Sequence, residues 1–444
     1  MSILDPISFA LNTEFSDLPQ SAVSDAMRGL TDTLGVGIAA SQTELSGIIK
    51  RHVVEQFAAG PNVGSKLWQD GRRVSPSGAA LANGMTIDAL DAHDGSKPTK
   101  GHVGCGVVAA TLAMSEGCSG QELLTRIAIG YEIGTRAGIA LHATAKEYHT
   151  SGAWIALACA AISARALTLD ATATREALGI AEYHGPRSPM MRCIDHPTMV
   201  KDGSGWGAMA GVSAAFLARD GFTGAPALTI ESADVAQIWK DLGKRWYISE
   251  QYIKLYPVCR WAQPAVEAVL GLTQKHSFES KDIAEIVVET FHEASRLTAI
   301  PHTTEQAQYS LPFSVAAAIQ RGTIGVAEVG VPGLRDPEII ALAQRVKMVQ
   351  RTEFDAAFPG NRFAVAKIAL ADGRMLCSDI TQAIGDPENP VSSDMIKQKF
   401  ISFAEPIIGV KNTIALLESI AVLPHAKSAD DVLHKMAAPI LATS

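Results

Sequence analysis

The feature that most constrains the fold is a long alternation of apolar segments and short polar loops. From Ser21 to about Leu270, segments rich in Ala, Gly, Leu and Ile recur, and none alternates with the period of a β-strand over a useful length. This pattern predicts helices, each closed by Gly or by a polar cluster. Only 6% of the residues are aromatic, so we expect close-packed helices with small side chains at their contacts. The expected helices include 103–116, 121–141, 152–167, 204–219 and 264–275.

The pattern changes near His276. Residues 283–289 (IAEIVVE) and 346–352 predict strands, and residues 363–370 and 374–380 flank Asp372-Gly373 as a predicted hairpin. Helices are expected between these strands, at 311–321 and 337–345, and again after Pro390. The sequence therefore predicts a mainly α protein with two domains. A large all-helical domain would be built from both chain ends, 1–270 and 396–444, and a smaller α+β domain would span 271–395.

Charge and composition exclude several classes of partner. The 444 residues carry a formal net charge of −8, which gives no electrostatic reason to expect nucleic acid or an anionic membrane. The apolar segment 154–167 is too short to span a bilayer and contains Arg165. The N-terminus lacks the basic and apolar regions of a secretory signal, and the six cysteines show no CxxC pair. We therefore expect a cytoplasmic protein that contacts neither nucleic acid nor membrane.

Candidate chemistry lies in polar loops that lead directly into apolar helices. Residues 88–106 (DALDAHDGSKPTKGHVGCG) place three carboxylates, two histidines and two lysines between apolar segments. Helix N-termini carry unpaired N–H groups, so several converging starts would suit carboxylate ligands. The alternative is that these side chains only cap their own helices or lie in solvent. The reactive positions just before expected helices are His102, Tyr148-His149, Lys201, and Arg260 to Gln263.

Nucleotide, metal and common hydrolase sites are disfavoured by spacing. Residues 104–109 match GxGxxA, but a Pro/Lys/Gly loop precedes them instead of a strand. His93 with Asp91 and Asp94 offers possible metal ligands, without an HExxH pair or another compact ligand set. Neither a G-x-S-x-G elbow nor a P-loop is present. We therefore expect neither a cofactor nor a metal.

Several segments together resemble the MmgE/PrpD family. The first runs from Asp88 through GHVGCGVVAATLAMSEGCSGQELLTRIAIGYEIGTR, an acidic loop that leads into a His, an apolar helix and a GYE…R helix. Further matches are KEYHTSGAWIALACAA, TMVKDGSGWGAMAGVSAAFLARDGFTG, KLYPVCRWAQPAVEA, SLPFSVAAAI and Lys399-Phe400. The resemblance follows the order of the chain over nearly its whole length, which makes it more specific than any single motif.

The resemblance implies a fold, an assembly and a class of substrate. It implies a helical domain made from both chain ends, an inserted α+β domain, a homodimer and a cofactor-free site between the domains. Members of the family include 2-methylcitrate dehydratases, cis-aconitate decarboxylases and iminodisuccinate epimerase, which all act on small anionic polycarboxylates. Motif matching implies that the family's acidic, histidine and lysine site positions correspond to Asp91, His102, His149 and Lys201.

Two positions depart from the lyases of the family. Gln263 stands where decarboxylases and dehydratases usually have His, and Phe313 stands where decarboxylases carry Tyr. The loop from Asp91 to His102 is also one residue longer. Because Gln cannot act as a general acid and Phe cannot donate a proton, the departures favour the iminodisuccinate epimerase of the family.

The resulting hypothesis is a cofactor-independent isomerase that inverts a carbon next to a carboxylate. Lys201, His149 and Tyr148 would transfer protons, and Asp91, His102, Arg260 and Gln263 would bind the substrate. The alternative is a lyase of the same family, a dehydratase or decarboxylase of a tricarboxylate. A non-catalytic helical scaffold is the third hypothesis, and it predicts that the polar loops lie dispersed on the surface.

Overall fold

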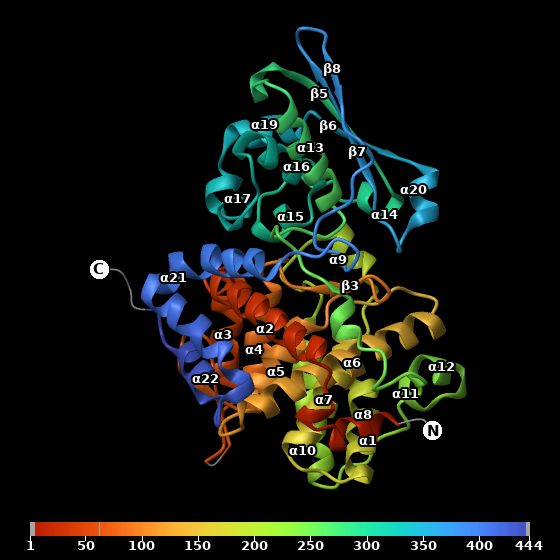
Figure 1. The fold of residues 1–444 in the computed structure, drawn as a ribbon, viewed down its shortest axis with the longest axis vertical. Coiled ribbons are helices and arrows are strands. Elements are labelled where there is room, and N and C mark those ends of the chain that lie inside the picture. Colours follow the sequence, from red (N-terminus) through yellow and green to blue (C-terminus); the bar gives the residue numbers. More distant parts are fainter. Residues whose placement is uncertain (1–4, 62, 441–444) are drawn as a thin grey trace.

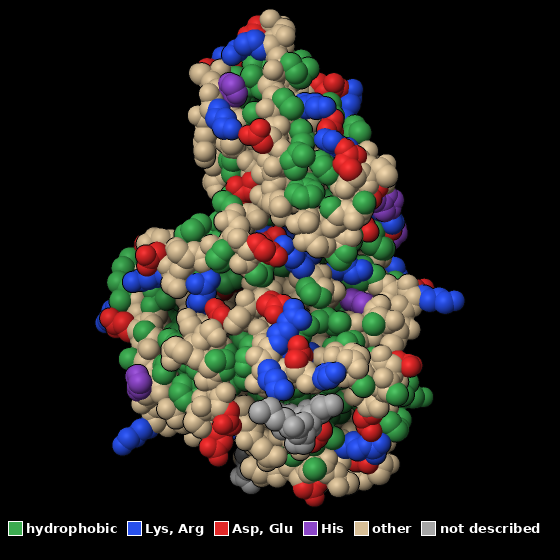
Figure 2. Space-filling view, turned by 45° about the vertical axis from the view of Figure 1, so that its right-hand side comes forward, with side chains coloured by type: hydrophobic (Ala, Val, Ile, Leu, Met, Phe, Trp, Pro, Cys, Tyr) green, Lys and Arg blue, Asp and Glu red, His purple; other side chains and the backbone are tan. Residues whose placement is uncertain are grey.

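The computed structural model describes residues 5–61 and 63–440. Helices dominate these residues, which confirms the mainly α prediction. Figure 1 shows a molecule drawn out along one axis, with most helices in a larger part and a four-stranded sheet with its own helices in a smaller part. The two parts meet at a waist that is also visible in the space-filling view (Figure 2).

The helices of the larger part begin near the N-terminus. They are α1 (Pro6–Asn12), α2 (Gln20–Ala40), α3 (Glu44–Gln56), α4 (Pro76–Asp88), α5 (Gly104–Ala113), α6 (Gly120–Thr144), α7 (Gly152–Ala166), α8 (Ala171–His184), α9 (Met191–Asp195), α10 (Ser204–Arg219), α11 (Leu228–Glu231) and α12 (Ala236–Trp239). Short 3-10 turns lie at Phe15–Asp17, Ala233–Val235, Tyr247–Glu250, Ser280–Asp282 and Leu423–His425. The expected helices are therefore present, with ends displaced by at most three residues.

The larger part is not all-helical, because two short antiparallel ladders cross it. One ladder joins β1 (Ser65–Lys66) to β2 (Arg73–Val74). The other joins β3 (Gly95–Ser96) to β4 (Gln251–Tyr252). The second ladder matters for the site, since it pairs the loop after α4 with a segment more than 150 residues further along the chain. Two-residue strands give too short an alternation to be detected in a sequence.

Small residues allow the central helices of the larger part to approach closely, as the composition predicted. A Cβ atom on Gly207 of α10 would lie 2.3 Å from the carbonyl oxygen of Gly152 in α7. At Gly211, one turn later, it would lie 2.3 Å from the carbonyl oxygen of Ala156. Neither position therefore accepts a side chain without moving backbone. The polar loops that precede α7 and α10 are brought together by this packing.

The smaller part is built on a mixed four-stranded sheet of order β6-β5-β7-β8. The strands are β5 (Ile283–Thr290), β6 (Val346–Gln350), β7 (Ala364–Leu370) and β8 (Met375–Cys377). β5 runs parallel to β6 and antiparallel to β7, with Ile286 opposite Val346 and Ile368. The predicted hairpin is confirmed: β7 and β8 are antiparallel, and Gly373 takes a positive φ of 89° in the turn.

Helices cover this sheet and connect its strands. They are α13 (Gln263–Lys275), α14 (His292–Ser295), α15 (Thr304–Gln308), α16 (Leu311–Arg321), α17 (Val326–Val329), α18 (Val331–Leu334), α19 (Pro337–Ala343) and α20 (Thr352–Ala357). α13 packs against α16 and β7, although the sequence analysis placed it with the large helical part. Its apolar periodicity predicted a helix correctly but carries no information about which part the helix joins.

The chain returns to the larger part at its C-terminal end, where α21 (Ser393–Ala421) packs along α2 and α22 (Asp430–Ala437) follows (Figure 1). α21 contains Pro406 and bends at Gly409, whose φ is 76°. It is the one described helix that is long and apolar enough to cross a membrane, a test that core helices also pass. The Nζ atom of its Lys399 is buried and donates to Asp32 Oδ1 at 2.6 Å.

Candidate active site

The starts of three apolar helices converge, but the carboxylates that they hold belong to the protein itself. The first N–H of α5 donates to Asp94. The first N–H of α10 lies 3.3 Å from Asp88 Oδ2. Ser151, at the N-cap of α7, donates to Asp202 Oδ2 at 2.5 Å. Because these N–H groups and hydroxyls are already engaged, an anionic substrate must be held by cationic side chains.

Asp91 organises two such cations. Its side chain is buried, and Lys254 Nζ donates both to Asp91 Oδ1 and to the Asp91 carbonyl oxygen, the latter at 3.1 Å. Gln308 Oε1 accepts from the Asp91 N–H at 2.8 Å and from Lys201 Nζ at 2.7 Å. Burial alone would raise the pKa of Asp91, but Lys254, His102 and Lys201 outweigh it and hold that pKa well below its usual range. The Asp91 carboxylate therefore pairs with Lys254, and Gln308 joins the Asp91 backbone to Lys201 in the same buried centre.

His102 presents a free ring nitrogen to this centre. Its Nδ1 lies 2.5 Å from the carbonyl oxygen of Asp94, so Nδ1 carries the hydrogen and Nε2 keeps its lone pair. Nε2 lies 3.8 Å from Asp91 Oδ1 and 3.9 Å from Asp202 Oδ2. Burial and the nearby Lys254 ammonium lower the pKa of His102 well below its usual value. The imidazole is therefore neutral at neutral pH and can accept a proton at Nε2.

Asp202 is the complementary proton donor. It is buried, and burial together with the neighbouring Asp88 carboxylate raises its pKa. Ser151 Oγ accepts from the backbone N–H of His102 at 2.9 Å and donates to Asp202, which holds the carboxyl next to the His102 backbone. A carboxyl whose pKa burial raises to about 7 thus lies 3.9 Å from a neutral imidazole, an arrangement suited to proton exchange near neutral pH.

The loops that carry two lysines of this region have an unusual backbone. Lys100 and Lys201 have φ angles of +53° and +49°, in the left-handed region that side-chain-bearing residues rarely adopt. Lys201 Nζ lies over the Tyr309 ring, 4.6 Å from its centroid, and Lys100 Nζ lies 4.3 Å from that of Tyr148. Tyr148 also donates its hydroxyl hydrogen to the Lys100 carbonyl. Such local strain is common where a structure must place a reactive side chain.

Three of the four site residues implied by the family resemblance lie together in this centre. Asp91, His102 and Lys201 are linked by the contacts above. His149 has different contacts in the described chain: its Nδ1 lies 2.8 Å from the Glu147 carbonyl oxygen, and its N–H donates to His142 Nε2 at 3.3 Å. It is half-buried and makes no described hydrogen bond to the other three residues. Geometry therefore favours His102 over His149 for proton transfer.

The side chains of the predicted substrate-binding residues Arg260 and Gln263 form hydrogen bonds with other groups of the protein. Arg260 donates to Asp386 Oδ1 at 2.5 Å, to Gln263 Oε1 at 2.9 Å and to the Ile384 carbonyl at 2.8 Å. Gln263 Nε2 donates to the carbonyl oxygens of Tyr256 and Val258. These bonds tie the start of α13 to the loop around Asp386, so both side chains support the site's framework.

Arg362, between α20 and β7, has no such hydrogen-bond partners in the described part of the protein. Its exposure is 2%, yet Nε, Nη1 and Nη2 have no hydrogen-bond partner among the described residues. Its guanidinium lies 5.1 Å from the centroid of the Tyr252 ring, whose edge also packs against His102 at a centroid distance of 6.2 Å. A buried guanidinium without a partner is costly, because burial removes the water that would otherwise solvate it.

Two cavities reach the polar centre. One, of about 480 Å³, is lined by Lys201, Thr150, Cys193 and Trp206, and its volume suits a small ligand. A second, of about 280 Å³, reaches Asp94 and Tyr131 from the opposite part of the loop cluster.

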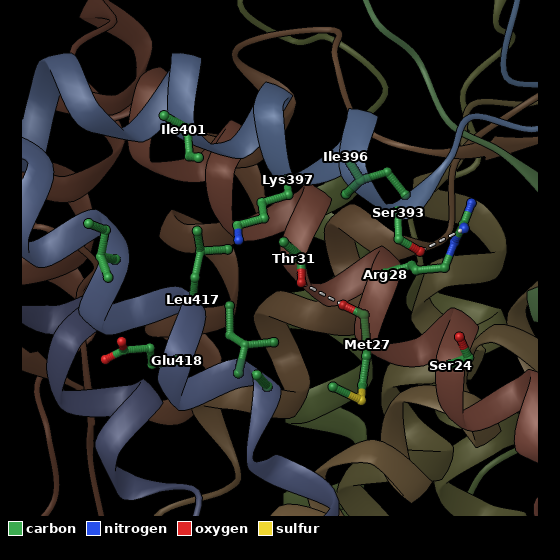
Figure 3. A pocket seen from close by; sticks show the side chains of 13 residues that line it. Ser24, Met27, Arg28, Thr31, Ser393, Ile396, Lys397, Ile401, Leu417 and Glu418 are labelled. Atoms are coloured by element: carbon green, nitrogen blue, oxygen red, sulfur yellow. Dashed lines mark hydrogen bonds between the residues drawn. The ribbon is translucent and has the colours of Figure 1, made fainter.

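A third cavity, of about 640 Å³, is mainly apolar. It lies between α2 and the two arms of α21 and is lined mainly by apolar side chains such as Met27, Ile401 and Leu417 (Figure 3). Arg28 bonds to Ser393 at one side of it, and the Lys397 amine points toward Leu417 (Figure 3). The buried polar centre, and not this apolar groove, is therefore the candidate active site.

Comparison with known proteins identifies the family. The MmgE/PrpD N-terminal domain matches residues 7–239 and the MmgE/PrpD C-terminal domain matches residues 256–422. The chain belongs to the MmgE/PrpD family. The first domain carries Asp91, His102 and Lys201, and the second carries Arg260 and Arg362, so the polar centre draws on both.

Curated relatives of this family member are enzymes. Cis-aconitate decarboxylase of Mus musculus is 23% identical over 440 residues, covering 91% of this chain and 87% of that protein. Cis-aconitate decarboxylase of Homo sapiens is 22% identical, covering 90% and 87%. The cis-aconitate decarboxylase-like protein oryM of Aspergillus oryzae is 21% identical, covering 91% and 92%. The named activities are decarboxylations, so the relatives favour the lyase alternative and give no support to an isomerase.

The two departures from the family's lyases lie in the protein interior. Phe313 is fully buried and is the third residue of α16. Its backbone N–H donates to Oγ of the N-cap residue Ser310 at 3.1 Å. Gln263 has 1% exposure and its amide is fully engaged. Neither side chain makes a described hydrogen bond to Asp91, His102 or Lys201. Gln263 therefore bonds and Phe313 packs within the protein, and neither supplies a titratable group to the centre.

Sequence reasoning missed several residues of the centre. Lys254 begins the quoted segment KLYPVCR, yet no local spacing signals that β4 pairs with β3 and brings it to Asp91. Gln308 and Tyr309 precede the quoted segment SLPFSVAAAI. Position 95 must be glycine for the strands β3 and β4 to pair this closely, since a Cβ there would lie 2.4 Å from the Tyr252 hydroxyl. These contacts depend on long-range packing, which a single sequence does not display.

One set of side chains in the centre has the composition of a metal site. Ligand atoms of Asp91, His93 and His102 lie within 4.8 Å of one another, and all three residues are buried. Both ring nitrogens of His93 lack a hydrogen-bond partner among the described residues. However, Asp91 Oδ1 already accepts from the Lys254 ammonium, so a metal ion there would lie against another cation. This repulsion disfavours metal binding while the ion pair is intact.

Proposed function

We propose that the chain is a lyase that decarboxylates a small tricarboxylate of the cis-aconitate type. The observation that carries the proposal is the neutral Nε2 of His102, which faces Asp91 and Asp202 in a buried centre with two lysine ammonium groups. The names and the near full-length coverage of the relatives support the same chemistry.

The proposed reaction needs charge stabilisation and one proton. The bond between carbon and the departing carboxylate breaks, and its electron pair is delocalised into a neighbouring unsaturated carboxylate as CO2 leaves. Lys201 Nζ and Lys254 Nζ are the cations suited to stabilise that developing negative charge. A proton must then be added to carbon. Asp202, whose pKa is raised by burial, can supply it through His102 Nε2, 3.9 Å away.

An epimerase would use the same centre differently. It would remove and return a hydrogen on carbon without losing CO2, and it needs a proton-transfer group on each face of that carbon. The sequence-based case for it rested on Gln263 and Phe313, whereas the named activities of the curated relatives are decarboxylations. Decarboxylation therefore takes precedence, and proton exchange without CO2 release becomes an outcome of the test.

The proposal also covers the assembly, the cellular location and the position of the site. We propose a homodimer in the cytoplasm that binds a small anionic polycarboxylate, with the site between a helical domain and an α+β domain. The packing of α13 against β7 supports a domain boundary before residue 263 and not at about 270.

The test combines product analysis with two histidine variants. Purified protein is incubated with cis-aconitate in D2O, and CO2 release and solvent deuterium in the product are followed by gas analysis and NMR. We expect one CO2 released and one deuterium on carbon in each product molecule. His102→Asn should lower the rate by roughly 10²- to 10⁴-fold, the usual contribution of a positioned acid or base. His276→Asn, at an exposed position, is the matched control and should keep the wild-type rate.

Each outcome separates the hypotheses. Deuterium exchange without CO2 release would replace the lyase by an epimerase. A large loss in His149→Asn with a normal His102→Asn would restore the sequence-based assignment of the proton-transfer residue. Absence of both reactions across a panel of polycarboxylates would overturn the proposed function.

A further inference from the structure

Around Arg362, positive charge exceeds the negative charge that the protein supplies. Arg260 and Lys97 both pair with Asp386, at 2.5 Å and 3.1 Å. Both oxygens of that carboxylate are therefore used. Arg362 and Lys100 have no ion pair within 4.0 Å among the described residues, although Arg362 lies close enough to lower the pKa of Lys100.

The burial of Arg362 makes this surplus significant. Its exposure is 2%, so water cannot replace the missing partners of its guanidinium. Lys100 is partly buried, and burial followed by the effect of Arg362 lowers its pKa, with only Glu293 acting in the other direction. Glu293 raises the pKa of Lys100 and Arg362 lowers the pKa of Asp386, but neither pair lies within ion-pair distance. A buried guanidinium without a bonded partner therefore indicates a ligand that carries negative charge.

The position of these cations relates them to the proposed reaction centre. Arg362 lies 5.1 Å from the centroid of the Tyr252 ring, and that ring packs against His102. Lys100 lies over the Tyr148 ring, and Tyr148 is close enough to Arg362 for the guanidinium to affect its pKa. Arg362 is thus about one aromatic ring away from the histidine that faces Asp91 and Asp202, and Lys100 precedes that histidine by two residues in the chain.

We propose that Arg362 and Lys100 form a second anion subsite, which binds a carboxylate of the substrate that does not react. The reacting carboxylate lies at His102, Lys201 and Lys254, and the second is held by the Arg362 fork, whose geometry matches a carboxylate. The inference rests on the proposed function and deepens it: the substrate class is a polycarboxylate with at least two separated carboxylates. Because Lys100 and Arg362 lie in different family domains, the ligand also bridges them.

The test measures binding of unreactive probes, so it does not depend on turnover. Tricarballylate, glutarate and butyrate carry three, two and one carboxylates on a similar carbon chain. We expect the wild type to bind tricarballylate most tightly and butyrate most weakly by calorimetry. Arg362→Gln should weaken tricarballylate binding by roughly 10- to 100-fold, the value of a charge-assisted bidentate bond. Arg362→Lys should retain part of it, and the butyrate affinity should stay unchanged in both variants.

Two control variants separate binding from structure. Arg374→Gln removes the same charge from the exposed β7–β8 turn and should bind the probes as the wild type does. Arg260→Gln removes a buried arginine that has protein partners, and its midpoint of thermal unfolding should fall. Ligand-free Arg362→Gln should unfold at the wild-type temperature or above it, because no partner is lost.

The inference is overturned if Arg362→Gln binds tricarballylate normally, if it unfolds as early as Arg260→Gln, or if the wild type binds none of the probes. Failure of the proposed decarboxylation has a different signature. In that case the probes would still bind with the Arg362 dependence described above, while cis-aconitate would release no CO2.

Discussion

Replacing Lys254 by Met tests whether one buried ion pair holds the reaction centre together. The Lys254 side chain has no exposure, and its ammonium donates to two oxygens of Asp91. Met fills nearly the same volume without the charge, so packing changes little. The carboxylate that remains is 2% exposed and loses the main cause of its lowered pKa. Breaking a buried pair from one side costs about 3–5 kcal/mol, a large share of the roughly 5–15 kcal/mol that stabilises a domain.

The double variant Asp91→Asn with Lys254→Met separates this cost from catalysis. It removes both charges, and the Gln308 bond to the backbone N–H of residue 91 does not depend on either side chain. We therefore expect it to regain about 2 kcal/mol or more relative to Lys254→Met alone. Neither variant should regain turnover, because the ammonium that stabilises the developing charge is missing.

Urea unfolding followed by circular dichroism at neutral pH gives both free energies, and the decarboxylation assay gives the rates. Arg136→Met removes a fully buried guanidinium that bonds to Asp241 and to two backbone carbonyls, and it provides a comparison without described bonds to the proposed reaction centre. It should be destabilised to a similar extent yet lose less activity per folded molecule. The reasoning is refuted if Lys254→Met is as stable as the wild type, or if the double variant is no more stable than the single one.

Two further predictions follow from the same centre. Lys201→Ala should lower turnover by roughly 10²- to 10⁴-fold with an unchanged circular dichroism spectrum, whereas a merely solvated lysine would change it only slightly. Burial raises the pKa of Asp94 to about 6, from 3.8 in the unfolded chain, so the stabilising proton is lost as the pH rises through about 6. Between about pH 5 and pH 8 the wild type should lose about 1 kcal/mol of stability that Asp94→Asn does not lose; equal slopes would contradict this.

Local patterns in the sequence were sufficient to predict most secondary structure. Residues 204–219 and 311–321 form helices with the expected bounds, because Gly203 and Ser310 before them and a polar residue or Gly after them mark both ends. The hairpin at Asp372-Gly373 was equally clear. The placement of α13 was not, since the contacts that assign it to the sheet come from residues about 100 positions away.

The polar centre was predicted in part, for a related physical reason. His102 and Lys201 precede α5 and α10, so the pattern of loops before apolar helices located them. Asp91 lies in the loop after α4 and was located by the density of polar residues there and by the family resemblance. Lys254 and Gln308 reach the same centre through a two-residue ladder and a side-chain amide, neither of which leaves a periodic signal.

The clearest limit of motif reasoning appears when Gln263 is compared with Arg362. Gln263 drew attention because a motif places it next to a reactive segment, yet every polar atom of its amide is bonded within the protein. Arg362 lies in the unremarkable segment GNRFAV and drew none, although its guanidinium has no described partner and little exposure. A polar group that the protein has already satisfied contributes to structure, whereas a buried one left unsatisfied must be stabilised by something else. Hydrogen-bond satisfaction therefore discriminates between the two arginines of this region, and it makes Arg362, rather than Arg260, the residue on which substrate affinity should depend.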